Sequence, residues 1–286
     1  MQMTADTTGA PCWFSLTTRD LPAAEAFYGG VLGWTFREAG PGRDVSVAES
    51  DGVPVAALCA VSDGFAVSVA WRAYFAVDDA DAAVTRIRSR GGTVGVGPVA
   101  GSPYGRAALA TDADGASFGI AEGDALSGWR SGGKATAWLE LHTRDAFDAA
   151  LFYGGVLGWA GEADTCCEVS YEREQVVLRH DGQAVARLDS GPVDGASPRP
   201  QLRPRWEVHF RVPDLDAAEA LVLEHGGTVL SDAFRPGHGR RITVRDPEGG
   251  LFTLDEAQPA RPSEPLTAAA LSAEIPCFRE DVLAAS

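Results

Sequence analysis

The octapeptide FYGGVLGW stands at residues 27–34 and returns unchanged at residues 152–159. The likeness extends upstream, because TTRDLPAAEAFYGGVLGW (17–34) aligns with HTRDAFDAALFYGGVLGW (142–159). An internal repeat of this length decides the fold, since each copy must form the same supersecondary unit. The chain is therefore predicted to contain two copies of one domain.

Each copy divides again into two similar units. The segment FAVDDADAAVTRIRSRGGTV (75–94) matches FRVPDLDAAEALVLEHGGTV (210–229), and the DADG turn (112–115) matches DPEG (246–249). In each unit a short apolar strand leads into an aspartate that can cap the following helix. Glycines end the helix, and further strands follow, the last one after a tight turn. We predict an α+β fold of four βαβββ units, two per domain.

The repeats also predict the boundaries of the domains within the 286 residues. The expected division is a flexible N-terminus (1–10), a first domain (11–122), a Gly- and Ser-rich linker (123–136), a second domain (137–257) and a C-terminal tail (258–286).

Composition narrows the classes of function. A net charge of −16 argues against nucleic-acid binding, which needs clustered Lys and Arg, and it favours cationic ligands through long-range attraction. No apolar run has the roughly 20 residues of a membrane helix, and the N-terminus lacks the regions of a signal peptide. The five cysteines include no CxxC pair, which favours buried, reduced thiols. We expect a cytoplasmic protein without membrane or nucleic-acid partners.

Taken together, the octapeptide opening, the F-x-V-x-D-x-DAA…GGTV segments and DPEGG-x-F-x-L resemble the vicinal oxygen chelate superfamily, the glyoxalase/bleomycin resistance protein/extradiol dioxygenase group. The nearest likeness is to its two-domain actinobacterial glyoxalase-like form. The resemblance implies curved, open-barrel sheets that hold ligands on their concave faces, and it makes the octapeptide part of the scaffold. Duplication supplies within one chain what single-domain relatives obtain by dimerising, so we expect a monomer or a weak homodimer. The superfamily includes enzymes and non-catalytic drug-binding proteins, so the resemblance leaves the function open.

Alternation along the predicted strands indicates which side chains line the concave faces. Apolar positions such as Leu139 and Phe252 are assigned to the helix layer, and the residues between them face the hollow. We expect Trp71, Trp206, Phe234 and Tyr104 at the rims. The predicted concave set is Trp13, Ser15, Thr17, Arg72, Tyr74, Ala76 and Gly119 in the first domain, and Trp138, Glu140, His142, Glu207, His209, Arg211 and Thr253 in the second.

The metal site of metal-dependent relatives does not carry over to this sequence. The positions that match their ligands are Trp13, Arg72 and Gly119 in the first domain, and Trp138, Glu207 and Thr253 in the second. Of these only Glu207 offers a suitable oxygen, whereas a divalent ion needs four or more ligands. We expect no metal and no other cofactor.

Two metal-independent functions remain open, and these ligand positions argue against a third, that of a metal-dependent glyoxalase or dioxygenase. In the first, the chain is a metal-independent binding protein that sequesters or presents a planar aromatic natural product, antibiotic- or polyketide-like and bearing an amine. Its predicted ligand-binding residues are Trp13, Ser15, Arg72, Tyr74, Trp138, Glu140, Glu207, His209 and Thr253. In the second, it is a metal-independent lyase, isomerase or cyclase of secondary metabolism, with Glu207, His209, Glu140 and His142 as acid–base groups. In a plainer alternative, the tryptophans only fill the hollow as core.

Overall fold

The structure is a computed structural model of the whole chain. It describes residues 8–39, 44–61, 68–101, 105–122, 137–159, 167–172, 175–180, 183–235 and 239–256. The predicted linker and C-terminal tail lie outside these ranges, as does Tyr104.

Each of the four predicted units has the order strand, helix, strand, strand, strand. The first domain comprises β1 (Pro11–Thr18), α1 (Leu21–Leu32), β2 (Thr35–Ala39), β3 (Val45–Ser50), β4 (Val53–Ala60), β5 (Ala70–Val77), α2 (Ala80–Ser89), β6 (Thr93–Gly101), β7 (Gly105–Thr111) and β8 (Ser117–Glu122). The second comprises β9 (Ala137–Thr143), α3 (Ala146–Leu157), β10 (Glu168–Glu172), β11 (Gln175–His180), β12 (Gln183–Ser190), the 3₁₀ helix η1 (Pro200–Leu202), β13 (Arg205–Val212), α4 (Leu215–Glu224), β14 (Thr228–Arg235), β15 (Gly239–Arg245) and β16 (Leu251–Glu256).

Each domain forms one eight-stranded mixed sheet, and the two sheets have the same topology. The first sheet has the order β2-β3-β4-β1-β5-β8-β7-β6, and the second has β10-β11-β12-β9-β13-β16-β15-β14. The first strands of the two units pair antiparallel at the centre, β1 with β5 and β9 with β13. The α+β prediction of four βαβββ units is therefore confirmed.

The helices begin where the sequence predicts. Asp20, Asp79, Asp145 and Asp214 each precede a helix, and each carboxylate accepts a hydrogen bond from a backbone N–H of the first turn. This contact satisfies a donor that the helix itself leaves unpaired. Two helices end at Gly33 and Gly158 with φ of 69° and 82°, a conformation that glycine adopts without strain.

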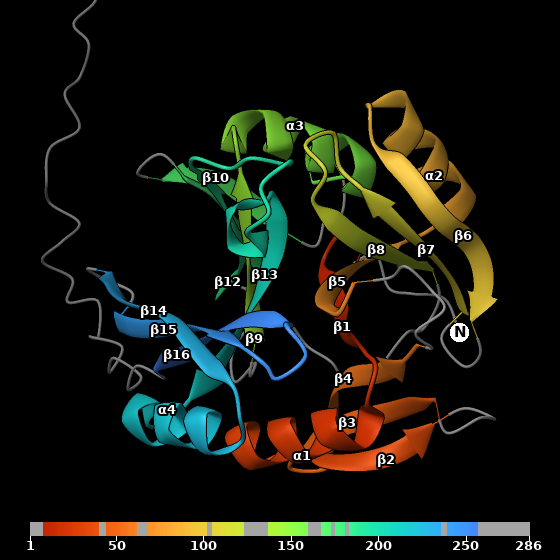
Figure 1. Cartoon of the computed structure of the whole chain (residues 1–286). Coiled ribbons are helices and arrows are strands. Elements are labelled where there is room, and N and C mark those ends of the chain that lie inside the picture. The colour runs from red at the N-terminus through yellow and green to blue at the C-terminus, as the bar shows by residue number, and fades with distance from the viewer. Residues whose placement is uncertain are drawn as a thin grey trace, which may run out of the picture.

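The helices of one domain pack against those of the other. Contacts join α1 to α4 and α2 to α3, and Figure 1 shows the two pairs at opposite ends of the molecule. The buried apolar residues of both domains form one continuous cluster on the helix side of the sheets. The two domains therefore share a core.

The repeated octapeptide forms the centre of this shared core. The Tyr28 hydroxyl donates to Asp246 Oδ2 of the other domain over 2.8 Å and accepts from Trp71 Nε1 over 2.9 Å. The second copy makes the equivalent contacts, in which the Tyr153 hydroxyl donates to Asp112 and accepts from Trp206 Nε1. The octapeptide recurs because each domain contributes the same half of a symmetric interface.

The prediction that Trp71 and Trp206 lie at the rims of the concave faces is wrong. Both side chains are 4% exposed and belong to the core between the domains. The reason is strand alternation, because each lies next in sequence to a residue of the opposite face, Arg72 or Glu207, and so points toward the helices. The side chain of Phe234 lies outside the described part of the chain.

The predictions of reduced cysteines and of a chain without membrane helices have different outcomes. Cys12 and Cys59 are free, whereas Cys167 forms a disulfide, so the prediction of reduced thiols is wrong for Cys167. Among the described helices, none is long and apolar enough to cross a bilayer.

Candidate functional site

Each sheet has one face covered by helices and one opposite face, called here the helix-free face. Phe14, Leu16 and Leu139 lie in the helix-side core, and their neighbours Trp13 and Trp138 lie on the other side. The alternation that the sequence predicted is thus observed in both domains. The two helix-free faces carry the candidate site residues, and the chemistry of the first face differs from that of the second.

The helix-free face of the first sheet is apolar and partly filled. Trp13 packs with Val47 and Ala57 in a small cluster of its own, and the half-buried Tyr74 packs against it. A Cβ atom at Gly119 would lie 2.2 Å from the Tyr74 ring, so the glycine makes room for that ring. Tyr74 therefore occupies the space that a coordinating side chain at position 119 would need.

Two polar residues complete this first face. Arg72 is half-buried and donates a hydrogen bond to the Thr17 hydroxyl. Burial lowers the pKa of Arg72 and raises that of Tyr74. Ser15 lies on the adjacent strand opposite Arg72 and is buried. The face combines two aromatic rings with one cation and offers no carboxylate from the predicted set.

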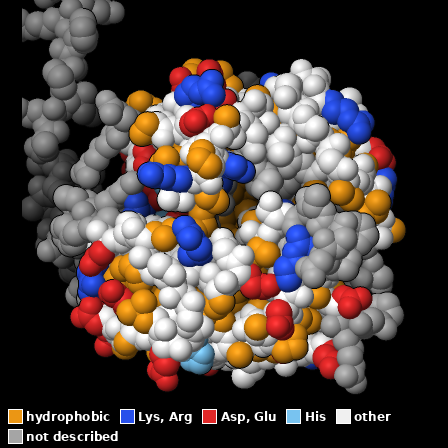
Figure 2. All heavy atoms as spheres, in the orientation of Figure 1, with side chains coloured by type: hydrophobic (Ala, Val, Ile, Leu, Met, Phe, Trp, Pro, Cys, Tyr) orange, Lys and Arg blue, Asp and Glu red, His pale blue; other side chains and the backbone are white. Residues whose placement is uncertain are grey.

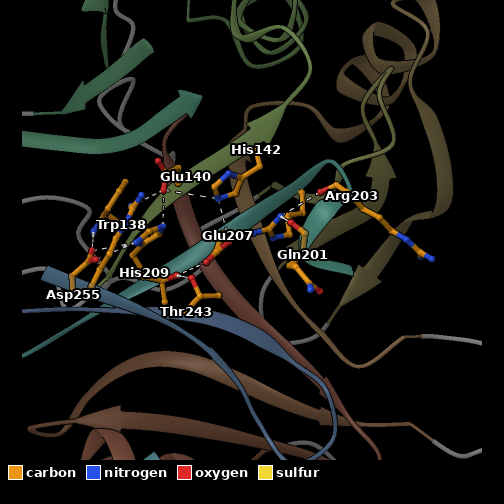
Figure 3. A network of polar contacts seen from close by, with 12 residues as sticks. Trp138, Glu140, His142, Gln201, Arg203, Glu207, His209, Thr243 and Asp255 are labelled. Carbon is orange, nitrogen blue, oxygen red and sulfur yellow. Dashed lines mark hydrogen bonds and ion pairs between the residues drawn. The ribbon is translucent and has the colours of Figure 1, made fainter. Parts of the chain in front are cut away.

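The helix-free face of the second sheet carries a network of charged groups. In the antiparallel register of β9 and β13, Glu207 lies opposite Glu140 and His209 opposite Trp138. Arg205 lies opposite His142 in the same ladder. This register brings both E-x-H patterns of the sequence side by side (Figure 3).

His209 lies at the centre of the network and is 1% exposed. Its Nδ1 is 3.2 Å from Asp255 Oδ2, its Nε2 is 3.2 Å from Glu140 Oε2, and its ring stacks on Trp138 with 3.9 Å between centroids. Burial alone would lower the pKa of His209, but Asp255 and Glu140 outweigh burial and raise the pKa to about 9. His209 is therefore a buried cation at neutral pH.

The two glutamates are buried and already have cationic partners. Glu140 accepts a hydrogen bond from Arg241 Nη1 over 2.8 Å, and Glu207 accepts from Arg205 and Thr253. Burial raises the pKa of each carboxyl, but His209 and Arg241 around Glu140 outweigh it and hold that pKa well below its usual range. His142 and Arg205 do the same at Glu207. Most of the negative charge on this face is thus neutralised within the protein.

His142 marks the accessible end of the network. Its side chain is 23% exposed, and its Nε2 lies 3.1 Å from Glu207 Oε2. The η1 segment borders this end, since Arg205 donates to the backbone carbonyl of Gln201 over 2.6 Å. A hollow of about 450 Å³ opens beside η1, and Figure 2 shows basic side chains around a depression on this side of the molecule. Its lining residues are Pro198, Arg199, Pro200, Gln201, Arg245 and Gly249.

Three residues of this face were missed by the sequence analysis. Asp255 receives the Trp138 indole N–H, Arg241 binds Glu140, and the Arg187 guanidinium lies over the Trp138 ring, 5.2 Å from its centroid. Each of the three stands next to an apolar core residue in its strand, so alternation contained the signal. This signal can be used for Arg187 and Arg241 only when it is known that β12 and β15 are strands.

Buried polar atoms without a hydrogen-bond partner gather around this network. Within the described ranges the four such side-chain atoms are Arg187 Nε, Gln201 Oε1, Arg205 Nε and His209 Nε2. His209 Nε2 forms an ion pair with Glu140 over 3.2 Å but is without a hydrogen-bond partner. Nearly all buried polar groups in folded proteins are paired, so such a concentration in one place marks a candidate site.

The residues present do not fit the metal of metal-dependent relatives. At the positions that match the metal ligands, Trp138 is fixed between His209 and Asp255, and Glu207 is bound by Arg205 and Thr253. A guanidinium next to Glu207 repels a second cation. In the described part of the chain no three His, Cys, Asp or Glu side chains are arranged to hold a metal ion.

Family models match both halves of the chain. Residues 138–254 match a glyoxalase-like domain, and residues 12–120 match the Glyoxalase/Bleomycin resistance protein/Dioxygenase superfamily. The chain belongs to this superfamily.

Similar proteins match along nearly the whole chain. The anthracycline biosynthesis protein DauV of Streptomyces sp. (strain C5) is 33% identical, over 91% of this chain and 98% of that protein. The anthracycline biosynthesis protein DnrV of Streptomyces peucetius is 32% identical with the same coverage. A putative glyoxylase, CFP32, of Mycobacterium tuberculosis is 29% identical, over 88% of this chain and 96% of that protein.

Solved structures show the same fold at low identity. A catechol 2,3-dioxygenase has a TM-score of 0.56 at 16% identity and covers 90% of this chain and 91% of its own. The Mn(II)-bound glyoxalase from Novosphingobium aromaticivorans has a TM-score of 0.55 at 16% identity, covering 87% and 82%. At this identity the likeness extends to the fold alone.

Proposed function

We propose that the chain is a metal-independent binding protein of secondary metabolism, which holds a planar aromatic small molecule on the helix-free face of the second sheet. The observation that carries the proposal is the state of Trp138. Trp138 is half-buried. The other tryptophans that the structure describes are all buried, namely Trp13, Trp34, Trp71, Trp159 and Trp206. The Trp138 ring is held in place by His209 and Asp255.

His209 and Arg187 already cover the faces of the Trp138 ring, so the rigid, partly exposed indole offers its edge to a flat ligand. Aromatic contacts contribute about 0.5–1.5 kcal/mol per pair beyond the burial of area. The planar guanidinium of Arg187 over the same indole can stack on the ligand as well. Because these groups are already ordered, binding costs less side-chain entropy.

The names of two relatives support a polyketide-like ligand. DauV and DnrV are both called anthracycline biosynthesis proteins, and they match this chain over 91% of its length. An aromatic polyketide is a large planar molecule of the kind that an indole surface binds. Metal independence is supported by the donor set at the matching positions, in which Glu207 is already bound by Arg205.

Fluorescence titration of EDTA-treated protein with 9,10-anthraquinone tests this proposal. We expect saturable quenching of tryptophan emission, with the quinone recovered unchanged by chromatography. The quenching should be weaker in Trp138→Phe and kept in Trp13→Phe, the matched substitution on the other sheet. Absence of saturable quenching, or quenching that needs an added divalent metal, would overturn the proposal.

A second candidate function rests on the pair formed by His142 and Glu207. A buried carboxylate 3.1 Å from the Nε2 of a partly exposed imidazole is the arrangement of a general base and its orienting group. The chain would then be a metal-independent lyase, isomerase or cyclase. Conversion of a bound polyketide quinone, lost in His142→Gln while its Kd is unchanged, would favour this enzyme over the binding protein.

A further inference from the structure

Arg187 differs from the other arginines on the helix-free face of the second sheet. Arg205 binds Glu207 and Arg241 binds Glu140, whereas the Arg187 guanidinium makes no hydrogen bond or ion pair within the described residues. Its Nε is buried and unpartnered. Glu140, which lies opposite Arg187 in the β9–β12 ladder, is already bound by Arg241 and His209, so burial of Arg187 removes hydration that hydrogen bonds do not replace.

Charges of both signs surround Arg187. Burial lowers the pKa of Arg187; among the charges near it, Glu140 and Glu172 raise this pKa, and Arg179 and Arg241 lower it. The buried imidazolium of His209 stacks on Trp138, the ring over which the Arg187 guanidinium lies. At close range these neighbours decide the local field, because charges beyond about 8–10 Å are largely screened at physiological salt. The net charge of the whole chain, which predicted a cationic ligand, is therefore a poor guide here.

We propose that the ligand carries an acidic oxygen group, a phenolate, enolate or carboxylate conjugated to its aromatic plane, and that Arg187 binds this oxygen while the plane lies against Trp138. This inference rests on the proposed function and adds the charge of the ligand to it. A guanidinium presents parallel N–H donors that match oxygen acceptors, and a charge-assisted pair of this kind is about twice as strong as a neutral hydrogen bond.

Three anthraquinones of similar shape test the charge preference by calorimetric titration at pH 7 in EDTA. They are the 2-carboxylate, which is an anion, the neutral 2-carboxamide, and the cationic 2-aminomethyl compound. We expect the carboxylate to bind at least about tenfold more tightly than the carboxamide, which corresponds to about 1.4 kcal/mol, and the amine to bind most weakly. In Arg187→Gln the preference for the carboxylate should disappear.

Two further variants control the result. Arg88→Gln removes the same charge from an exposed position on α2 and should keep the preference. Arg187→Lys keeps the charge without the planar donor pair and should bind the carboxylate with intermediate affinity. Circular dichroism of each variant verifies the fold before titration.

The outcomes separate the two proposals. Equal binding of the three compounds, tighter binding of the amine, or a carboxylate preference that survives in Arg187→Gln would overturn the inference and leave the proposed function standing. If none of the three compounds binds the wild-type chain, the proposed function fails and the inference fails with it.

Discussion

The hydroxyl of Tyr28 in the first domain donates a 2.8 Å hydrogen bond to Asp246 in the second. Asp246 belongs to the DPEG turn, where its other carboxylate oxygen accepts from the backbone N–H groups of Glu248 and Gly250. One carboxylate thus organises a turn of its own domain and receives the central tyrosine of the other. Burial raises the pKa of Asp246, whereas the hydrogen bonds from Tyr28 and from the backbone N–H groups lower it, because they stabilise the charged carboxylate.

Tyr28→Phe should therefore lower the stability of the whole chain. The substitution leaves Asp246 Oδ2 and the Trp71 N–H without their hydrogen-bond partner, a loss of about 1–3 kcal/mol in the free energy of unfolding. Urea denaturation followed by circular dichroism measures it. Tyr171→Phe, on an exposed tyrosine, is the control and should change stability by less than about 0.5 kcal/mol. An equal effect of the two substitutions would contradict the interface.

A close approach across the domains makes a second prediction. A Cβ atom at Gly227 would lie 2.8 Å from the Phe27 ring of the octapeptide and 2.9 Å from a Val222 methyl group. Gly227→Ala should overpack the shared core and cost about 1–3 kcal/mol. Gly195→Ala, where no atom lies within 4 Å of the added Cβ, should have almost no effect on the denaturation midpoint. Tolerance of alanine at Gly227 would show that the helices are not packed as described.

The two arginines of the helix-free face should respond differently to removal. Arg241→Gln leaves the buried Glu140 short of a cationic partner and should cost about 3 kcal/mol of stability. Arg187→Gln removes a guanidinium whose buried Nε has no hydrogen-bond partner, and it should leave stability within about 1 kcal/mol of wild type, or raise it. Thermal unfolding of both variants provides the comparison. A large loss in Arg187→Gln would assign this residue to folding instead of ligand binding.

The charged state of His209 makes stability depend on pH. Its pKa of about 9 in the folded chain exceeds the ordinary value of 6.5, so the folded state binds this proton more tightly than the unfolded state. The stabilisation is complete below about pH 6.5 and is lost as the pH rises through about 9. The lowered pKa values of Glu140 and Glu207 act in the opposite sense and stabilise the fold above their ordinary value of 4.5.

NMR titration of the imidazole Cε1–H resonances measures the pKa of His209 directly. We expect one histidine to titrate at about 9, and its resonance should be missing in His209→Gln. If all imidazoles of the folded chain titrate near 6.5, the ion pairs of His209 with Asp255 and Glu140 do not form as described.

The repeats of the sequence were sufficient to predict the fold. The octapeptide, the capping aspartates and the DxxG turns recur at fixed positions, and each specifies a local structure that does not depend on the rest of the chain. Alternation also placed Trp13, Glu140 and His209 on the correct face, because the strands beside them have clear apolar positions.

Pairing between strands could not be predicted from the sequence in the same way. Arg187 and Arg241 reach Trp138 and Glu140 only through the register of β12 and through the side chains of β15, two strands with weaker patterns. For the same reason the sequence presented Glu140 and Glu207 as available carboxylates, whereas both are bound by arginines. Charge balance at a site depends on contacts between strands that are distant in sequence, which composition does not reveal.

A crystal structure of the EDTA-treated chain with anthraquinone-2-carboxylate tests the central claim most directly. We predict the rings on the helix-free face of the second sheet against Trp138, a carboxylate oxygen on the Arg187 guanidinium, and no metal ion beside Glu207. A ligand bound elsewhere on the molecule, or an ion coordinated by Glu207, would contradict the account.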